Sequence, residues 1–277
     1  MAKRAGAKPA RLDAELVRRG LARSRAHAAE LIEAGRVSVR GVLAHKPATG
    51  VSPDISLVVA EDGSDEDWAS RGAHKLLGAL EAFEPLGLTV NGRCCLDAGA
   101  STGGFTDVLL RRGARTVVAA DVGRGLLIWR LRTDERVEVL ERTNVRALTT
   151  EQIGGEVDLI VADLSFISLG LVLPALASCL AAEADLVPMV KPQFEVGKQR
   201  VGAGGVVRDP ALHAEAVRTV IGEAATLGLT PRGVVASPLP GPSGNVEYFV
   251  WLRRGPAPDP ELVARMVDDA VAAGPAR

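Results

Sequence analysis

Short apolar runs alternate with amphipathic helical patterns between residues 71 and 254, and this alternation most constrains how the chain folds. Seven runs have the length and composition of strands: Arg93–Ala98, Thr116–Asp121, Val137–Leu140, Val157–Asp163, Asp185–Val190, Gly233–Ser237 and Glu247–Leu252. Helical patterns lie between them, at Gly104–Arg112, Ser168–Ala182 and Pro210–Leu227. This order predicts an α/β fold with a parallel sheet and helices on both faces. Ligands of such sheets bind beyond the carboxyl ends of the strands.

The charges divide the chain into a basic start and an acidic remainder. Residues 1–50 hold 11 Lys and Arg against 4 Asp and Glu, whereas the other residues hold 22 against 30. This asymmetry indicates a polyanion-binding module joined to a separate body, although a solvated basic tail is the alternative. We expect domains at 1–60 and 71–254, an acidic linker at 61–70 and a tail at 255–277.

Several classes of protein are disfavoured by composition. No stretch approaches the roughly 18 apolar residues of a membrane span, and no apolar segment follows the basic N-terminus as in a signal peptide. Three cysteines and four scattered histidines lack the spacing of a metal site. The few cysteines suit a reducing cytoplasm. We therefore expect a cytoplasmic protein without metal or membrane contact, and nothing indicates an oligomer.

The basic start has the pattern of two short helices followed by a strand. Leu12, Leu16 and Val17 share one helix face, while Ala28, Leu31 and Ile32 share another. Gly20 suits the end of the first helix and Ser24 the cap of the second. From Arg11 to about Val59 this pattern resembles the S4 RNA-binding domain, a small α+β module. The resemblance implies that six residues face RNA: Arg11, Arg23, Ser24, Arg25, His27 and Arg36.

A glycine-rich turn follows the first large-domain strand, in the sequence LDAGASTGGFT. It matches neither the P-loop nor the GxGxxG dinucleotide pattern. The acid before the turn, Asp97, would repel a pyrophosphate but attract the aminoacyl end of S-adenosylmethionine. At the end of the next strand, Asp121 can accept hydrogen bonds from ribose hydroxyls. A tight structural turn is the alternative.

This segment resembles the cofactor loop of class I methyltransferases, whose sheet is Rossmann-like. The resemblance implies S-adenosylmethionine as cofactor, with the methionine part near the glycine turn, the ribose at Asp121 and the adenine near Asn144. The implied cofactor-binding residues are Asp97, Gly99, Ala100, Ser101, Gly103, Phe105, Asp121, Val122 and Asn144.

Four charged residues, Lys75, Asp163, Lys191 and Glu247, are candidates for catalysis. Asp163 and Lys191 end strands, where the sheet places its ligand, and Lys191 follows an apolar run. An alcohol that attacks a methyl group must lose its proton, and a lysine can accept it if its surroundings lower its pKa from about 10.4. The order Lys, Asp, Lys, Glu matches the tetrad of ribose 2′-O-methyltransferases. Ordinary ion pairs are the alternative.

Five motifs together, RGAHKL, LDAGASTGGFT, VVADLSFIS, VKPQFEVGK and PLPGPSGNVEYF, make residues 11–254 closely resemble the bacterial TlyA family. The resemblance implies methylation of cytidine 2′-hydroxyls in 16S and 23S ribosomal RNA, with ribosomal RNA or subunits as partner. It also implies capreomycin and viomycin susceptibility and a historical hemolysin label. The chain departs from the family in its acidic linker residues Asp65–Asp67 and in the run Val122–Leu126.

Two rival functions predict features that differ from these. A membrane-acting cytolysin requires a span or a strongly amphipathic basic helix, and neither is evident. A non-catalytic RNA-binding protein would tolerate loss of Lys191 or Asp163.

The four glycines between Phe194 and Val207 predict a loop that closes over RNA, or simply an exposed loop.

Overall fold

The computed structural model describes residues 10–22, 24–33, 35–52, 55–59, 68–241, 243–257 and 259–274. The chain divides into two compact units, Met1–Asp67 and Trp68–Arg277, and each is described by itself. Among the described residues, no helix has the length and apolar character needed to cross a bilayer.

The first unit packs two helices, α1 (Leu12–Arg18) and α2 (Arg25–Glu33), over short strands. The strands form two small sheets, β1 (Ala10–Arg11) with β4 (Gly50–Val51), and β2 (Val37–Val39) between β3 (Val42–Leu43) and β5 (Leu57–Val59). The predicted apolar faces form the core, with Leu12, Leu16 and Ala28 fully buried. Ser24 Oγ accepts a hydrogen bond from the His27 amide, so Ser24 caps α2 as predicted.

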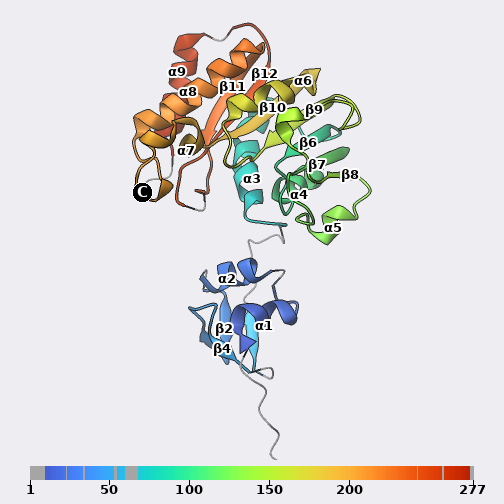
Figure 1. Cartoon of the computed structure of the whole chain (residues 1–277), viewed down its shortest axis with the longest axis vertical. Coiled ribbons are helices and arrows are strands. Elements are labelled where there is room, and N and C mark those ends of the chain that lie inside the picture. The colour runs from blue at the N-terminus through green and yellow to red at the C-terminus, as the bar shows by residue number, and fades with distance from the viewer. Residues whose placement is uncertain are drawn as a thin grey trace, which may run out of the picture. The chain divides into compact units, whose positions relative to one another are not determined.

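The second unit contains a seven-stranded sheet in the order β11-β12-β10-β9-β6-β7-β8 (Figure 1). Its strands are β6 (Cys94–Ala98), β7 (Thr116–Ala120), β8 (Val137–Leu140), β9 (Val157–Ala162), β10 (Leu180–Val190), β11 (Leu229–Ala236) and β12 (Tyr248–Arg254). The α/β class is confirmed, but the sheet is not wholly parallel, because β12 runs antiparallel to both of its neighbours. The described residues of the connection from β11 to β12 form no helix, and the connection is too short for a crossover between parallel strands.

Helices cover both faces of this sheet. The helices in the described part of this unit are α3 (Gly72–Phe83), α4 (Gly104–Arg111), α5 (Trp129–Arg132), α6 (Leu173–Ser178), α7 (Pro192–Glu195), α8 (Pro210–Thr226) and α9 (Pro260–Ala272). Alternate residues of β9 belong to different hydrophobic cores, one on each face of the sheet. Leu159 and Val161 pack with residues of α3 and α4, whereas Ile160 and Ala162 pack with residues of α6, α8 and α9. Two buried faces explain why the strands read as continuous apolar runs.

The helix predicted at Ser168–Ala182 is wrong in its extent. The chain there forms a 3₁₀ turn, η3 (Leu169–Leu171), then the short α6, and then enters β10. Pro174 has no backbone N–H to donate, which suits the first turn of α6 rather than the interior of a longer helix. Leu180 pairs with Val157 in the sheet, and this pairing replaces the helical continuation.

Two predicted boundaries also shift. Trp68 and Ala69, placed in the linker by sequence, are buried in the second unit, where the Ala69 amide donates to Asp107. The predicted tail contains α9, which packs against α8 and β11 and buries Val267 and Ala270. Residues 61–67 of the predicted linker lie outside the described residues.

Candidate active site

The turn between β6 and α4 needs glycine at two positions. Gly99 has φ of 89°, and a Cβ there would lie 2.6 Å from the carbonyl oxygen of Asp163. Gly103 has φ of 102°, and the side chains of Leu127 and Leu131 lie against the space that its Cβ would fill. The turn after β6 therefore approaches the end of β9 closely at Gly99, and leucine side chains pack against it at Gly103.

Asp97, the last-but-one residue of β6, is fully buried. Its Oδ2 atom accepts a hydrogen bond from Thr106 Oγ at 2.7 Å, and its Oδ1 atom has no partner among the described residues. Burial raises the pKa of this carboxyl group to about 7. A buried acceptor without a donor fits an incoming ammonium group, such as the one at the aminoacyl end of S-adenosylmethionine.

Asp121 follows β7 directly, at the carboxyl end of the strand. Its carboxylate accepts hydrogen bonds from the backbone amides of Ser101 at 2.8 Å and Gly123 at 2.6 Å. These three residues and Ala100 line a small cavity, so the structure brings together the predicted methionine and ribose positions. Each carboxylate oxygen keeps a free lone pair, which suits the two hydroxyls of an adenosine ribose.

The remaining predicted cofactor residues lie elsewhere. Phe105 is buried and packs on Phe249, with ring centroids 5.9 Å apart, while Val122 is 69% exposed. The Asn144 side chain accepts from the Arg146 amide and caps the turn η2 (Val145–Ala147). Their contacts with cofactor stay predictions.

Sequence reasoning missed Glu141, which lines the small cavity beside Asp121. Glu141 accepts hydrogen bonds from the Gly125 amide, in the run where the chain departs from the family, and from Arg132 in α5. Its position directly after β8 was the available signal, since ligands bind at strand ends.

Lys191 and Asp163 form the first of two lysine–carboxylate pairs. They follow the neighbouring strands β10 and β9, and Lys191 Nζ lies 2.5 Å from Asp163 Oδ1. Lys191 Nζ also donates to Ser165 Oγ at 2.9 Å. The Lys191 side chain is only 7% exposed, so its ammonium group is held in a fixed place at the carboxyl edge of the sheet.

Lys75 and Glu247 form the second pair. Lys75 extends from α3, Glu247 precedes β12, and their Nζ and Oε2 atoms are 2.5 Å apart. Both residues are buried. A Cβ on Gly241 would lie 2.5 Å from Glu247 Oε1, so a glycine there leaves room for the carboxylate. The four residues of the predicted tetrad thus meet as two pairs from four elements.

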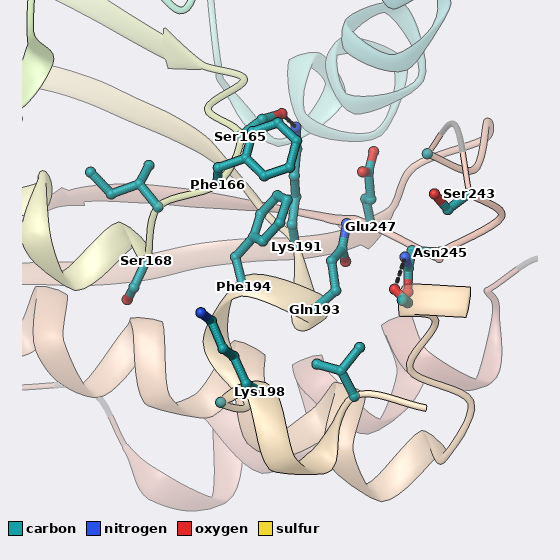
Figure 2. A pocket seen from close by; sticks show the side chains of 15 residues that line it. Ser165, Phe166, Ser168, Lys191, Gln193, Phe194, Lys198, Ser243, Asn245 and Glu247 are labelled. Carbon is teal, nitrogen blue, oxygen red and sulfur yellow. Dashed lines mark hydrogen bonds between the residues drawn. The ribbon is translucent and has the colours of Figure 1, made fainter. Parts of the chain in front are cut away.

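Lys191 and Glu247 line one cavity of about 900 Å³, shown in Figure 2. Its wall includes the rings of Phe166 and Phe194, whose centroids are 5.3 Å apart. Phe166 is 91% exposed and has φ of 63°, an uncommon conformation for a bulky residue. Sequence reasoning did not single out these aromatics, although both follow strand ends within the quoted motifs. The cavity is large enough for a nucleotide.

Asn245 anchors the far end of the glycine-rich stretch beside this cavity. Its Oδ1 accepts from the Val207 amide at 3.0 Å, and its Nδ2 donates to the Gly205 carbonyl at 2.9 Å. A His213 ring nitrogen lies 2.9 Å from the carbonyl oxygen of Val207. These contacts fix Val207, while closure of the stretch over RNA stays a prediction.

In the first unit, Arg11 and Arg25 both bind Asp13, at 2.9 and 3.0 Å. The Asp13 side chain is 6% exposed, whereas the two arginine side chains are 51% and 61% exposed. The hydrogen bond from Arg11 holds the pKa of Asp13 well below its usual range. Of the other predicted RNA contacts, Arg23 lies outside the described residues. In the part of the chain that is described, no three His, Cys, Asp or Glu side chains gather as a metal site.

Comparisons with known proteins agree with this arrangement. Residues 68–254 match the family model of the FtsJ-like methyltransferases, and residues 10–54 match that of the S4 domain. The chain is 64% identical to the Mycobacterium tuberculosis 16S/23S rRNA (cytidine-2′-O)-methyltransferase TlyA, over 96% of this chain and 97% of that protein. It is 36% identical to Hemolysin A of Brachyspira hyodysenteriae, over 86% and 98% of the two chains.

A solved structure named "Putative hemolysin from Streptococcus thermophilus" superposes with a TM-score of 0.74 and 35% identity, covering 95% of this chain and 96% of that one. The resemblance inferred from motifs is therefore confirmed, and so is S-adenosylmethionine as the cofactor of the family. The chain belongs to the TlyA family of S-adenosylmethionine-dependent methyltransferases, in which an S4 domain precedes an FtsJ-like domain.

Proposed function

We propose that this protein methylates the 2′-hydroxyl of cytidine in ribosomal RNA. Three observations support the proposal: relatives that carry this activity in their names, the S4 domain, and a cavity lined by Lys191 and Glu247. The two lysine–carboxylate pairs are its main structural support, because their charged groups are fixed where a substrate hydroxyl would enter.

When bound, S-adenosylmethionine supplies a methyl group on a positively charged sulfur. In its neutral amine form, Lys191 is placed to hold the attacking hydroxyl and to take up its proton at Nζ. Asp163 and Ser165 hold Nζ from two sides and so fix its direction. Lys75 and Glu247 form a second ion pair, which orients the ribose. Asp97 would hold the aminoacyl end of the cofactor and Asp121 its ribose.

The first unit supplies binding to the RNA backbone. Exposed guanidinium groups such as those of Arg11 and Arg25 grip phosphates with paired hydrogen bonds. The partner is then ribosomal RNA or a ribosomal subunit, and the reaction takes place in the cytoplasm, where ribosomes are. A membrane-acting cytolysin is not favoured, because the methyltransferase family and the paired tetrad account for the best-defined site of the chain.

Mass spectrometry of ribosomal RNA tests this function. Ribosomal subunits from cells that lack the gene are incubated with the protein and S-adenosylmethionine, and the RNA is then digested by ribonucleases. We expect one added methyl group on the ribose of specific cytidines, and none in subunits incubated without the protein. Methyl groups found only on bases, or none at all, would contradict the proposal.

A further inference from the structure

Gln193 has a buried hydrogen-bond acceptor that the described residues leave unmatched. The residue lies on α7, two positions after Lys191, and lines the cavity that Lys191 and Glu247 share. Its side-chain Oε1 atom is inaccessible to solvent and has no hydrogen-bond partner among the described residues. A buried acceptor left without a donor is unfavourable. Because Gln193 lines the cavity, a rotation of its terminal amide would turn Oε1 toward a donor on the substrate.

The surroundings of Gln193 indicate which part of a nucleotide it would meet. In Figure 2 its side chain rises from α7 between Phe194 and Asn245. Phe194 and Phe166 offer ring faces in the same cavity, a surface suited to a flat base. Lys191 lies on the same short stretch of backbone and has been assigned to the ribose hydroxyl. Gln193 is therefore placed beside the base of a nucleotide whose 2′-oxygen is at Lys191.

The chemistry of cytidine leaves one donor for this acceptor. Within an RNA chain, cytidine donates hydrogen bonds only from its 2′-hydroxyl and from its exocyclic amine, and the hydroxyl is engaged by Lys191. We infer that Gln193 Oε1 accepts a hydrogen bond from the exocyclic amine of the target cytidine. This inference rests on the proposed function. Uridine carries a carbonyl oxygen in place of the amine, so two acceptors would face each other and uridine would be disfavoured.

A cycle of variants and modified substrates tests the contact. The probe is a ribosomal subunit reconstituted with RNA in which the mapped target cytidine is replaced by pyrimidin-2-one riboside, which lacks the amine. The full-length protein and its Gln193→Met variant are compared on this probe and on unmodified subunits in single-turnover methylation. Methionine keeps the length of glutamine but cannot accept a comparable hydrogen bond.

We expect the parent protein to lose about 10- to 100-fold in rate when the amine is removed, as typical for a hydrogen bond that leaves a buried group unpaired. Gln193→Met should be slow on cytidine by a similar factor, and removal of the amine should then cost it little more. Equal loss in parent and variant would overturn the inference, because the residue and the amine would then act independently.

Gln193→Glu keeps the acceptor and the chain length, so it should still respond to removal of the amine, and it serves if the methionine variant fails to fold. If removal of the amine leaves the methylation rate of the glutamate variant unchanged, the proposed contact would also be overturned. Failure of the parent to methylate unmodified cytidine would instead overturn the proposed function, and the inference with it. The two failures are distinguishable because the parent on unmodified subunits is measured first.

Discussion

The Arg25–Asp13 pair of the first unit and the Lys191–Asp163 pair of the second both join a base to an acid, but they differ in which side chain is the more buried. In the first unit the Asp13 carboxylate is 6% exposed, while the bound Arg25 side chain is 61% exposed. At the tetrad the Lys191 side chain is 7% exposed, while its partner Asp163 is 25% exposed. An exposed arginine that is bound to a buried aspartate can still donate hydrogen bonds to a phosphate in the solvent. A buried lysine can meet only a group that enters its cavity. In these two pairs, the exposed arginine is therefore suited to backbone binding and the buried lysine to chemistry.

Replacing the buried cation should have the largest effect. Lys191→Ala removes the proposed proton acceptor, and loss of a general base typically costs about 10²–10⁴ in rate. Single-turnover methylation with cofactor and ribosomal subunits at saturation measures this directly. Lys198→Ala is the matched control, since Lys198 lines the same cavity but is exposed, and its chemical step should stay near that of the parent. A Lys191→Ala rate within a few-fold of the parent would leave positioning alone to explain catalysis.

Asp97 is a buried acid that has no basic partner among the described residues, and it should make cofactor binding depend on pH. Burial raises its pKa to about 7, so below that pH the carboxyl group is protonated and cannot receive an ammonium group as a carboxylate. Cofactor binding must then release a proton, so affinity should fall as the pH drops from 7, approaching about tenfold per unit. Calorimetry at pH 7 and pH 6 measures this change.

Asp97→Asn is the control for that titration, because an amide has no proton to lose in this range. Its affinity should be weaker and should not change between the two values. If the parent shows the same flat profile as the variant, Asp97 does not meet the charged end of the cofactor.

The exposed arginines should have smaller effects that depend on salt. Arg25→Gln removes one proposed phosphate contact, so the slope of log affinity against log salt should become shallower by about 1, with a modest loss of affinity. Arg218→Gln is a matched control in the second unit, because Arg218 is also exposed and paired with an aspartate, Asp268. Filter binding to ribosomal subunits at several salt concentrations compares them. Equal slopes for both variants would show that burial of the counter-acid does not mark RNA-binding arginines.

The sequence predicted most of what depends on local pattern. Strand ends placed Asp121, Asp163 and Lys191 at one edge of the sheet, because parallel strands bring their carboxyl ends together. The pairing of Lys75 with Glu247 could not be derived from spacing, since it joins residues 172 positions apart. It was reached only through the resemblance to known tetrads.

Features set by tertiary contacts were missed or wrong. The extent of the helix at Ser168–Ala182 failed because pairing of Leu180 with β9 overrode the helical pattern. The direction of β12 depends on its short connection to β11, which periodicity does not report. Ser165 and Gln193 matter through atoms that only folding brings beside Lys191 or into its cavity. Polar residues within two or three positions of a functional strand end were the signal that could have found them.

The identity of the oxygen that receives the methyl group tests the account most directly. Subunits are reconstituted with RNA that carries 2′-deoxycytidine at the mapped target, and methyl transfer from labelled S-adenosylmethionine is compared with that to unmodified subunits. The tetrad is placed for a ribose hydroxyl, so transfer to the deoxy substrate should fall to background while the protein still binds the subunit. Transfer at the parent rate would contradict the account, because the acceptor would then not be the 2′-oxygen that Lys191 is proposed to hold.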